Sequence, residues 1–228
     1  VLQTFSRQID LNAFEFFSQA ALDKVTAQMG HAKPFDTETP FYALLEFEGS
    51  SEALMDKAMT LFEQTVEQGW VMDGVLSQSL SQAESLWKLR EDISETLWHW
   101  QPYKNDISVR VSRMPGFLRE VDELVASRYP DFEVVWYGHI GDGNLHLNIL
   151  KPENLSSQDF VARCVPVSSE IGQLLAKYEG SVSAEHGVGL LKKDYLHYSR
   201  SPLELELMKQ VKKAFDPNGI LNPGKLFD

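Results

Sequence analysis

Cysteine is almost missing from this sequence. Its 228 residues include a single cysteine, Cys164. A framework of intrachain disulfides, the usual support of small secreted domains, is therefore excluded. A lone thiol fits a reducing compartment, and we expect the cytoplasm, or the mitochondrial matrix if the source is eukaryotic.

Long apolar runs and an excess of positive charge are missing too. No apolar stretch approaches the roughly 18 residues that a membrane-crossing helix needs, so we expect no transmembrane segment. Acidic residues outnumber basic ones by 33 to 21, which gives a net charge of −12. Such a chain repels nucleic acid and anionic lipid surfaces, and both are excluded as partners.

Signals for secretion and for nucleotide binding are also missing. The N-terminus has no signal-like pattern, and because Val1 falls in what resembles the middle of a strand, we expect a piece of a longer protein. No phosphate-binding loop ending in GK[ST] occurs. The glycine-rich stretch GHIGDG lies in a predicted hairpin without a following helix, so it lacks the context of a dinucleotide fingerprint.

What the sequence does contain is a regular succession of strands and helices. The extended segments predicted from alternation are 1–7, 14–17, 41–48, 71–77, 106–111 and the two arms of a hairpin over 132–149. The predicted helices cover 18–29, 54–66, 81–97, 115–125, 157–178 with a kink or break at Pro166, 190–199, and 202–215. Similar element order in the two halves predicts an α+β fold, in which ferredoxin-like units share an antiparallel sheet covered by helices, followed by a helical C-terminal segment.

The stretch 137–149, YGHIGDGNLHLNI, predicts a tight hairpin. Asp142-Gly143 is a favoured two-residue loop of type I′, which needs positive φ at both residues. This turn would place His139 opposite His146, with Cβ atoms about 4.5–5.5 Å apart, which suits two metal ligands. The period of two puts Asn148 on the same face. The opposite, core-facing side is formed by Ile140, Leu145, Leu147 and Ile149.

A second short stretch, 183–189 or SAEHGVG, supplies the complementary groups. Glu185 would complete a set of two histidines and one carboxylate, which leaves coordination positions open for a substrate. These ligand types favour zinc, with manganese, cobalt or iron as alternatives. His186 cannot easily share the ion with its neighbour, so it is available as a base. An ordinary half-exposed hairpin with structural histidines remains the alternative at this point.

Arg90 lies within or beside the apolar stripe of the helix predicted over 81–97. A buried guanidinium needs an anion, because burying an unpaired charge is costly. The anion can belong to a ligand or to a structural ion pair, and a snorkelling side chain is the third alternative.

Three motifs, GHIGDGNLHLN, SAEHGVG and FDPNGILNPGK, together resemble the C-terminal half of the FAD-linked oxidases of the vanillyl-alcohol oxidase superfamily. The resemblance spans nearly the whole chain and is nearest to the D-2-hydroxyglutarate and D-lactate dehydrogenase branch. It implies FAD held mainly by an N-terminal domain or subunit outside this chain. It also implies an electron acceptor such as an electron-transfer flavoprotein, and it is compatible with a homodimer.

The resemblance also implies roles for individual residues. It assigns the substrate carboxylate to Arg90, Ser94 and Lys104, further substrate contact to Asn148, and a cofactor contact in the C-terminal tail to Asn222. It further implies that His186 removes the substrate's hydroxyl proton. Two positions depart from related sequences: Ser94 stands where a relative carries threonine, and Arg110 stands where proline is frequent.

These expectations define a domain plan and a function. Residues 1–180 are expected to form a substrate-binding α+β cap domain with two related units, and residues 181–228 a catalytic loop with a helical C-terminal segment. The expected activity is flavin-dependent oxidation of a D-2-hydroxy acid, D-2-hydroxyglutarate or a similar compound, and the chain alone is expected to be inactive. The alternatives are a D-lactate or glycolate-type dehydrogenase, a flavin-independent metalloenzyme, and a non-catalytic binding domain.

Overall fold

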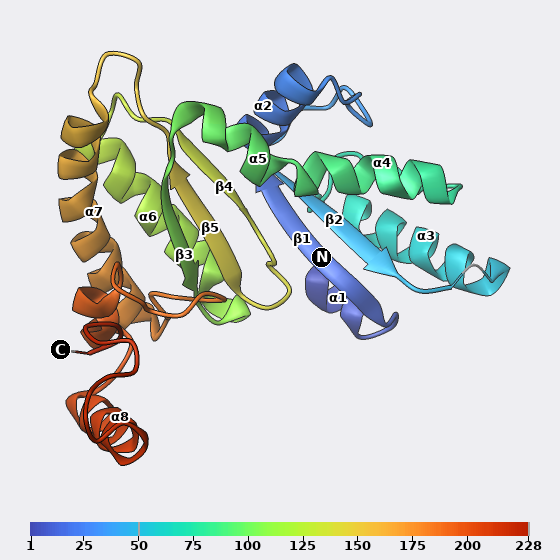
Figure 1. The fold of residues 1–228 in the computed structure, drawn as a ribbon. Coiled ribbons are helices and arrows are strands. Elements are labelled where there is room, and N and C mark those ends of the chain that lie inside the picture. The colour runs from blue at the N-terminus through green and yellow to red at the C-terminus, as the bar shows by residue number, and fades with distance from the viewer. Residues whose placement is uncertain (50, 228) are drawn as a thin grey trace. The chain divides into compact units, whose positions relative to one another are not determined.

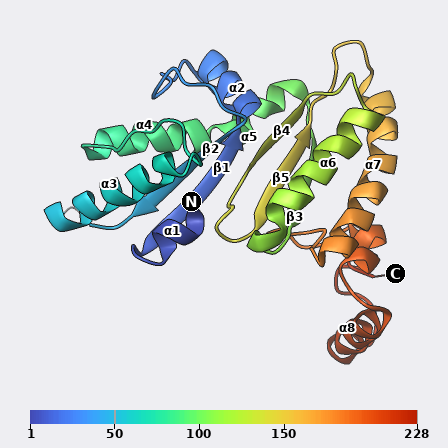
Figure 2. The same cartoon turned by 180° about the vertical axis from the view of Figure 1, so that it is seen from behind.

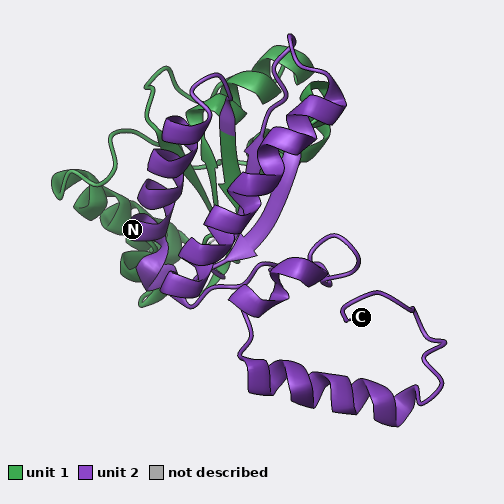
Figure 3. Ribbon diagram, turned by 90° about the vertical axis from the view of Figure 1, so that its left-hand side faces the viewer, with its two compact units in different colours: residues 1–101, 135–141 green, residues 102–134, 142–228 purple. Residues whose placement is uncertain are grey.

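The chain divides into two compact units. The computed structural model describes residues 1–49 and 51–227, and Figure 1 shows the order of their helices and strands. One unit comprises residues 1–101 and 135–141, and the other comprises residues 102–134 and 142–228 (Figure 3). The second unit continues through residue 180, where the sequence predicts a functional boundary. That functional boundary stays a prediction.

The first unit is built on three strands with helices packed against them. Its elements are α1 (Leu2–Ser6), β1 (Leu11–Ser18), α2 (Gln19–Met29), β2 (Phe41–Phe47), α3 (Glu52–Glu67), α4 (Leu80–Glu91), α5 (Ile93–Leu97), η1 (Trp98–Trp100) and β4 (Val134–Gly138). Strand β1 pairs antiparallel with β2 on one side and with β4 on the other. Helix α4 packs against β1 and β2, and α2 packs against α4 and α5. This arrangement carries Glu15 of β1 and Arg90 of α4 into the buried interior.

The second unit is a strand pair backed by two long helices. Its elements are β3 (Tyr103–Ser108), η2 (Val111–Arg113), α6 (Met114–Arg128), β5 (Asn144–Ile149), α7 (Ser157–Tyr178), η3 (Lys193–Tyr198) and α8 (Pro202–Phe215). Helices α6 and α7 lie side by side, and α7 contacts β3 (Figure 2). Leu145, Leu147 and Ile149 of β5 are fully buried, as the alternation in the sequence predicts.

The five strands form one sheet in the order β2-β1-β4-β5-β3. The pairings of β1 with β2, of β1 with β4 and of β3 with β5 are antiparallel. The predicted α+β class with an antiparallel sheet is therefore confirmed. Among residues 1–49 and 51–227, no helix combines the length and the apolarity that crossing a bilayer would require.

Several helices begin and end where the sequence predicts. Helix α7 spans 157–178 and continues through Pro166, so of the predicted kink or break the break is excluded. Helix α8 spans 202–215 as predicted and begins with a capping box: Ser201 accepts from the backbone of Glu204, whose side chain accepts from the backbone of Ser201. The predicted helix over 190–199 is a shorter 3-10 helix, η3.

Two of the predicted strands are absent from the structure. Residues 1–7 are not a strand, because helical spacing brings Phe5 into a cluster with Ile9, Ala58 and Leu61. Residues 71–77 form no strand, and the side chain of Met72 is largely exposed to solvent.

The helix predicted over 81–97 is two helices, α4 and α5, that meet at Asp92. The N-cap of α4 is Ser79, two residues before the predicted start, and its side chain accepts from the backbone of Gln82. Asp92 also forms a side-chain contact of 2.6 Å with His31. Ser94 is therefore carried by a separate short helix that follows Arg90.

The tip of the hairpin differs from the predicted type I′ turn. Strands β4 and β5 are joined by five residues, 139–143, and the described positive φ angles include Gly143 at 81° but not Asp142. Contacts outside the hairpin hold the connection in this form. The amide of Gly141 donates to the carbonyl of Phe14 at 2.9 Å, and the carbonyl of Gly143 accepts from the amide of Val109 at 3.0 Å.

Candidate metal and substrate site

The pairing of β3 with β5 creates a face of polar residues. Lys104 lies opposite Asn148, Asp106 opposite His146, and Ser108 opposite Asn144. Opposed residues of an antiparallel pair share a face, so these three pairs line the same side of the ladder. The alternate pairs on the other side are Tyr103 with Ile149, Asn105 with Leu147, and Ile107 with Leu145.

Asp106 is the carboxylate among these three pairs, and both of its oxygens make contacts. Its Oδ1 lies 3.4 Å from Nδ1 of His146, and its Oδ2 accepts from the backbone amides of Glu185 at 3.1 Å and His186 at 3.4 Å. Burial alone would raise the pKa of the Asp106 carboxyl, but the contacts with His146 and with the two amides hold that pKa well below its usual range. Asp106 is therefore an anion that connects β5 to the 183–189 segment.

Two buried asparagines complete this face. Asn144 donates its side-chain amide to Oε1 of Glu185 at 2.6 Å, and Asn148 donates to the backbone carbonyl of His146 at 3.3 Å. The side-chain oxygens of Asn144 and Asn148 are buried and have no hydrogen-bond partner among the described residues. Buried acceptors without partners are costly unless a ligand or water supplies a donor.

His139 is held by a different carboxylate. Its Nδ1 lies 2.8 Å from Oε1 of Glu15, and Oε2 of Glu15 lies 2.9 Å from Nη2 of Arg90. Glu15 and Arg90 are both buried, and the guanidinium lies 4.8 Å from the ring centroid of Tyr137. The anion that Arg90 contacts is Glu15, which is the structural ion pair that the sequence left open as an alternative.

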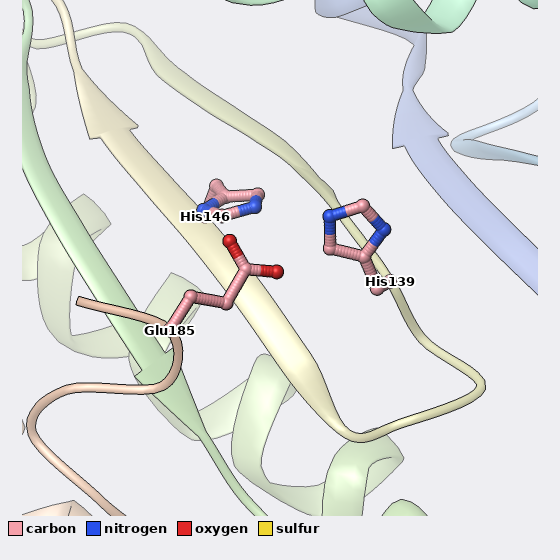
Figure 4. A group of neighbouring side chains, drawn as sticks. All are labelled: His139, His146 and Glu185. Carbon is pink, nitrogen blue, oxygen red and sulfur yellow. The ribbon is translucent and has the colours of Figure 1, made fainter.

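Figure 4 shows the three predicted ligands, His139, His146 and Glu185. One ligand atom from each of them can be chosen so that all lie within 4.8 Å of one another. Each histidine has Nδ1 beside a carboxylate, which directs Nε2 to bind an ion. Two imidazole nitrogens and a carboxylate are a donor set that suits a divalent ion such as zinc and leaves coordination positions open. The residues present therefore fit a metal ion.

The remaining predicted residues have varied surroundings. Lys104 is exposed on β3, although partial burial lowers the pKa of its amine. Ser94 on α5 is half-buried, and the side chain of His186 is exposed. Asn222 lies in the exposed C-terminal turn with a φ of 48°. The roles of these residues in binding stay predictions.

Arg110, whose role the sequence leaves open, is a surface residue. Its Nη1 lies 3.4 Å from Oε2 of Glu179. Both side chains are more than half exposed, so this contact contributes little to stability.

Sequence reasoning missed the groups that hold the ligands. Glu15 is the one acid in the apolar run FEFF, and Asp106 opens the predicted strand DISVRV, so each carried a signal as a charge within a buried strand. Asn144 gave no signal of its own. Lys192 is half-buried: its amine donates to the backbone carbonyl of Asp106 at 2.9 Å, and burial lowers the pKa of this amine.

Comparison with known proteins identifies the class of this chain. Residues 1–226 match the family described as FAD linked oxidases, C-terminal domain, so the chain belongs to this family. The resemblance found in the sequence motifs is confirmed. A solved structure, 4-ethylphenol oxidase from Gulosibacter chungangensis in complex with isoeugenol, shares the fold with a TM-score of 0.60 over 94% of this chain and 47% of the oxidase, at 11% sequence identity.

Two bacterial relatives are much more similar in sequence. D-2-hydroxyglutarate dehydrogenase of Stutzerimonas stutzeri (strain A1501) is 59% identical over 227 residues, which cover 100% of this chain and 49% of the relative. D-2-hydroxyglutarate dehydrogenase of Xanthomonas citri pv. viticola is 52% identical over 228 residues and is covered to 48%. The chain therefore spans about half the length of the curated relatives it matches.

Proposed function

We propose that this chain is the substrate- and metal-binding half of a flavin-dependent D-2-hydroxy acid dehydrogenase, which oxidises D-2-hydroxyglutarate or a similar acid to the 2-oxo acid. The observation that carries the proposal is the grouping of His139, His146 and Glu185 within 4.8 Å. Family membership and the names of the bacterial relatives support the reaction type. The part of the protein outside this chain would hold most of the FAD.

The metal ion is assigned to His139, His146 and Glu185. Zinc suits these ligands best, and manganese, cobalt or iron are alternatives. Such an ion, when bound, supplies a Lewis acid that lowers the pKa of a coordinated hydroxyl group. The buried side-chain oxygen of Asn148 faces no described donor and would accept a hydrogen bond from the substrate.

His186 is assigned as the base. Its side chain is exposed and therefore accessible to a substrate, and it follows the ligand Glu185 directly in the chain. The amide of His186 donates to Asp106 at 3.4 Å, which ties the base to the strand that lies opposite His146. The imidazole would take the hydroxyl proton as the Cα hydride leaves. FAD, which the rest of the protein would mainly hold, would supply the acceptor for the hydride, and Asn222 is our candidate for a contact with it from this chain.

The second carboxylate of a dicarboxylic substrate is assigned to Lys104, with Ser94 and Arg90 as further contacts. Lys104 lies opposite Asn148 in the β3–β5 ladder, which puts a cation beside a proposed substrate contact. A cation in that place favours hydroxyglutarate or malate over lactate.

A D-lactate or glycolate-type substrate is the second candidate. It is favoured by the ion pair between Arg90 and Glu15, because an arginine that already has a buried anion is less available to a substrate carboxylate. Family membership speaks against a flavin-independent metalloenzyme or a non-catalytic domain. A reducing compartment, an electron-transfer flavoprotein as acceptor and a homodimer belong to the same proposal.

The test uses the full-length protein purified with its flavin and without chelators. We expect anaerobic bleaching of the flavin by D-2-hydroxyglutarate or D-malate, and about one divalent ion per chain. His146→Ala should bind the ion much more weakly and lose the bleaching, whereas His186→Gln should keep the ion and lose the bleaching. His99→Gln, which alters an exposed histidine that packs edge-on to Trp100, is the matched control. A flavin that no D-2-hydroxy acid reduces would refute the proposal.

A further inference from the structure

We propose that Asp106 is the positioning residue that orients both the ligand His146 and the segment carrying Glu185 and His186. This inference rests on the proposed metal site. It extends that site by naming the group that sets the geometry of two ligands and of the base together.

Asp106 makes contacts with both of its carboxylate oxygens. Oδ1 of Asp106 faces Nδ1 of His146 at 3.4 Å, and Oδ2 accepts from the amides of Glu185 and His186. The backbone carbonyl of the same residue accepts from the Lys192 amine at 2.9 Å. One residue of β3 therefore contacts the ligand strand and both ends of the 185–192 segment.

The contact with Asp106 also affects which nitrogen of His146 carries the proton. If Nδ1 carries the proton and donates to Oδ1, Nε2 keeps its lone pair and can bind an ion. An asparagine at position 106 offers only one acceptor. If that oxygen serves the amides of Glu185 and His186, the asparagine NH2 group faces Nδ1 and favours the tautomer with the proton on Nε2, which cannot bind a metal.

The segment 185–187, next to Asp106, is exposed to solvent. Residues Glu185, His186 and Gly187 are exposed, so packing alone does not fix their positions. The backbone amides of Glu185 and His186 both donate to the side chain of Asp106. The amide of Ala184 donates to the backbone carbonyl of Asp106 at 3.3 Å. Loss of the carboxylate would therefore remove, in one event, a backbone contact of a metal ligand and a backbone contact of the base.

The experiment measures metal affinity rather than turnover. Full-length, flavin-loaded protein is stripped of metal and titrated with zinc against a competing chelator, and the visible spectrum of the cobalt-loaded protein is recorded. We expect Asp106→Asn to weaken zinc binding by about 10- to 100-fold and to change the cobalt spectrum. Asp106→Glu keeps both acceptor oxygens, so we expect a smaller loss, and it replaces the asparagine variant if that variant fails to fold.

A double-mutant cycle separates positioning from a general loss of structure. Because Asp106 acts through His146, the loss caused by Asp106→Asn should be smaller in the His146→Ala background than in the unaltered protein. The control is Asp216→Asn, which alters another buried aspartate that accepts from two backbone amides, those of Ile220 and Leu221. Its zinc affinity should equal that of the unaltered protein.

The outcomes distinguish this inference from the proposed function. If the unaltered protein binds zinc and His146→Ala binds it much more weakly, but folded Asp106→Asn and Asp106→Glu bind as tightly as the unaltered protein, the positioning role is refuted and the metal site stands. Full additivity in the cycle also refutes it. If the unaltered protein binds no divalent ion, the metal site and the positioning role fail together.

Discussion

Nη2 of Arg90 lies 2.9 Å from Oε2 of Glu15, with both side chains buried. The other oxygen of Glu15 contacts Nδ1 of His139 at 2.8 Å, so the arginine acts on the histidine through the glutamate. A buried carboxylate without a cation would be costly, and Arg90 offsets that cost. Glu15 and Asp106 thus occupy equivalent places, each beside Nδ1 of a proposed ligand.

Replacing Glu15 should weaken both stability and metal binding. Glu15→Gln leaves Arg90 buried without an anion, and we expect the free energy of unfolding to fall by about 3–5 kcal/mol. The loss of the carboxylate beside His139 should also lower zinc affinity by about 10-fold or more. Urea denaturation and chelator competition on the full-length protein measure the two effects.

A double variant separates these two effects. Glu15→Leu with Arg90→Met removes both charges, and apolar pairs of similar volume commonly restore the stability lost when one partner is removed. We expect the free energy of unfolding to recover and the zinc affinity to stay low. Recovery of zinc affinity together with stability would show that Glu15 has only a structural role.

Lys104→Met should change which acids the enzyme accepts. A hydrogen bond to a charged group contributes about 1.5–3 kcal/mol, so kcat/KM for D-2-hydroxyglutarate should fall by about 10-fold or more. For D-lactate, which has no second carboxylate, kcat/KM should change little. Lys33→Met, at an exposed lysine paired with Asp23, is the control. Equal losses for both substrates would contradict the assignment of Lys104 to the distal carboxylate.

The Cys164 thiol should be unreactive in the folded protein. It is fully buried, and burial raises its pKa to about 12, so the thiol stays protonated at neutral and mildly alkaline pH. We expect iodoacetamide at pH 8 to label Cys164 only after denaturation, with Cys164→Ala as the blank in mass spectrometry. Rapid labelling of the native protein would show that α7 opens readily.

Asp216 should contribute to the acid limit of stability. The Lys212 amine, hydrogen-bonded at 2.9 Å, lowers the pKa of this carboxyl against the effect of burial, and the amides of Ile220 and Leu221 add to the lowering. A carboxyl with a depressed folded pKa stabilises the fold above its unfolded pKa near 3.8 and loses that contribution as the pH falls through the folded value. Thermal midpoints from pH 6 to pH 2.5 should therefore fall less steeply in Asp216→Asn.

Local signals were sufficient to predict much of the fold. The capping box at Ser201 and the apolar spacing of α7 depend on residues a few positions apart, and both helices lie where predicted. The two histidines and Glu185 carry recognisable donor chemistry in short motifs. By contrast, α1 was mistaken for a strand because Phe5 is buried by contacts with α3, which no short window reveals.

The partners of the proposed ligands could not be predicted, because they depend on long-range register. Glu15 precedes His139 by 124 residues, and Asp106 precedes Glu185 by 79 residues. Asp106 faces His146 only because β3 pairs with β5 in one particular alignment, and a shift by one residue would place Asn105 or Ile107 there. The type I′ turn failed for a similar reason, since Phe14 and Val109 hold its glycines from outside.

The distance along the chain between Asp106 and Glu185 has a thermodynamic consequence. An unfolded polypeptide does not hold these segments together, so an ion that binds the assembled site selects the native state alone. At a free ion concentration of about 100 times the dissociation constant, such linkage adds about 2.7 kcal/mol to the native state. The cellular supply of the ion would then affect the abundance of this protein as well as its catalytic rate. Without the ion, more molecules would be unfolded and cleaved by proteases.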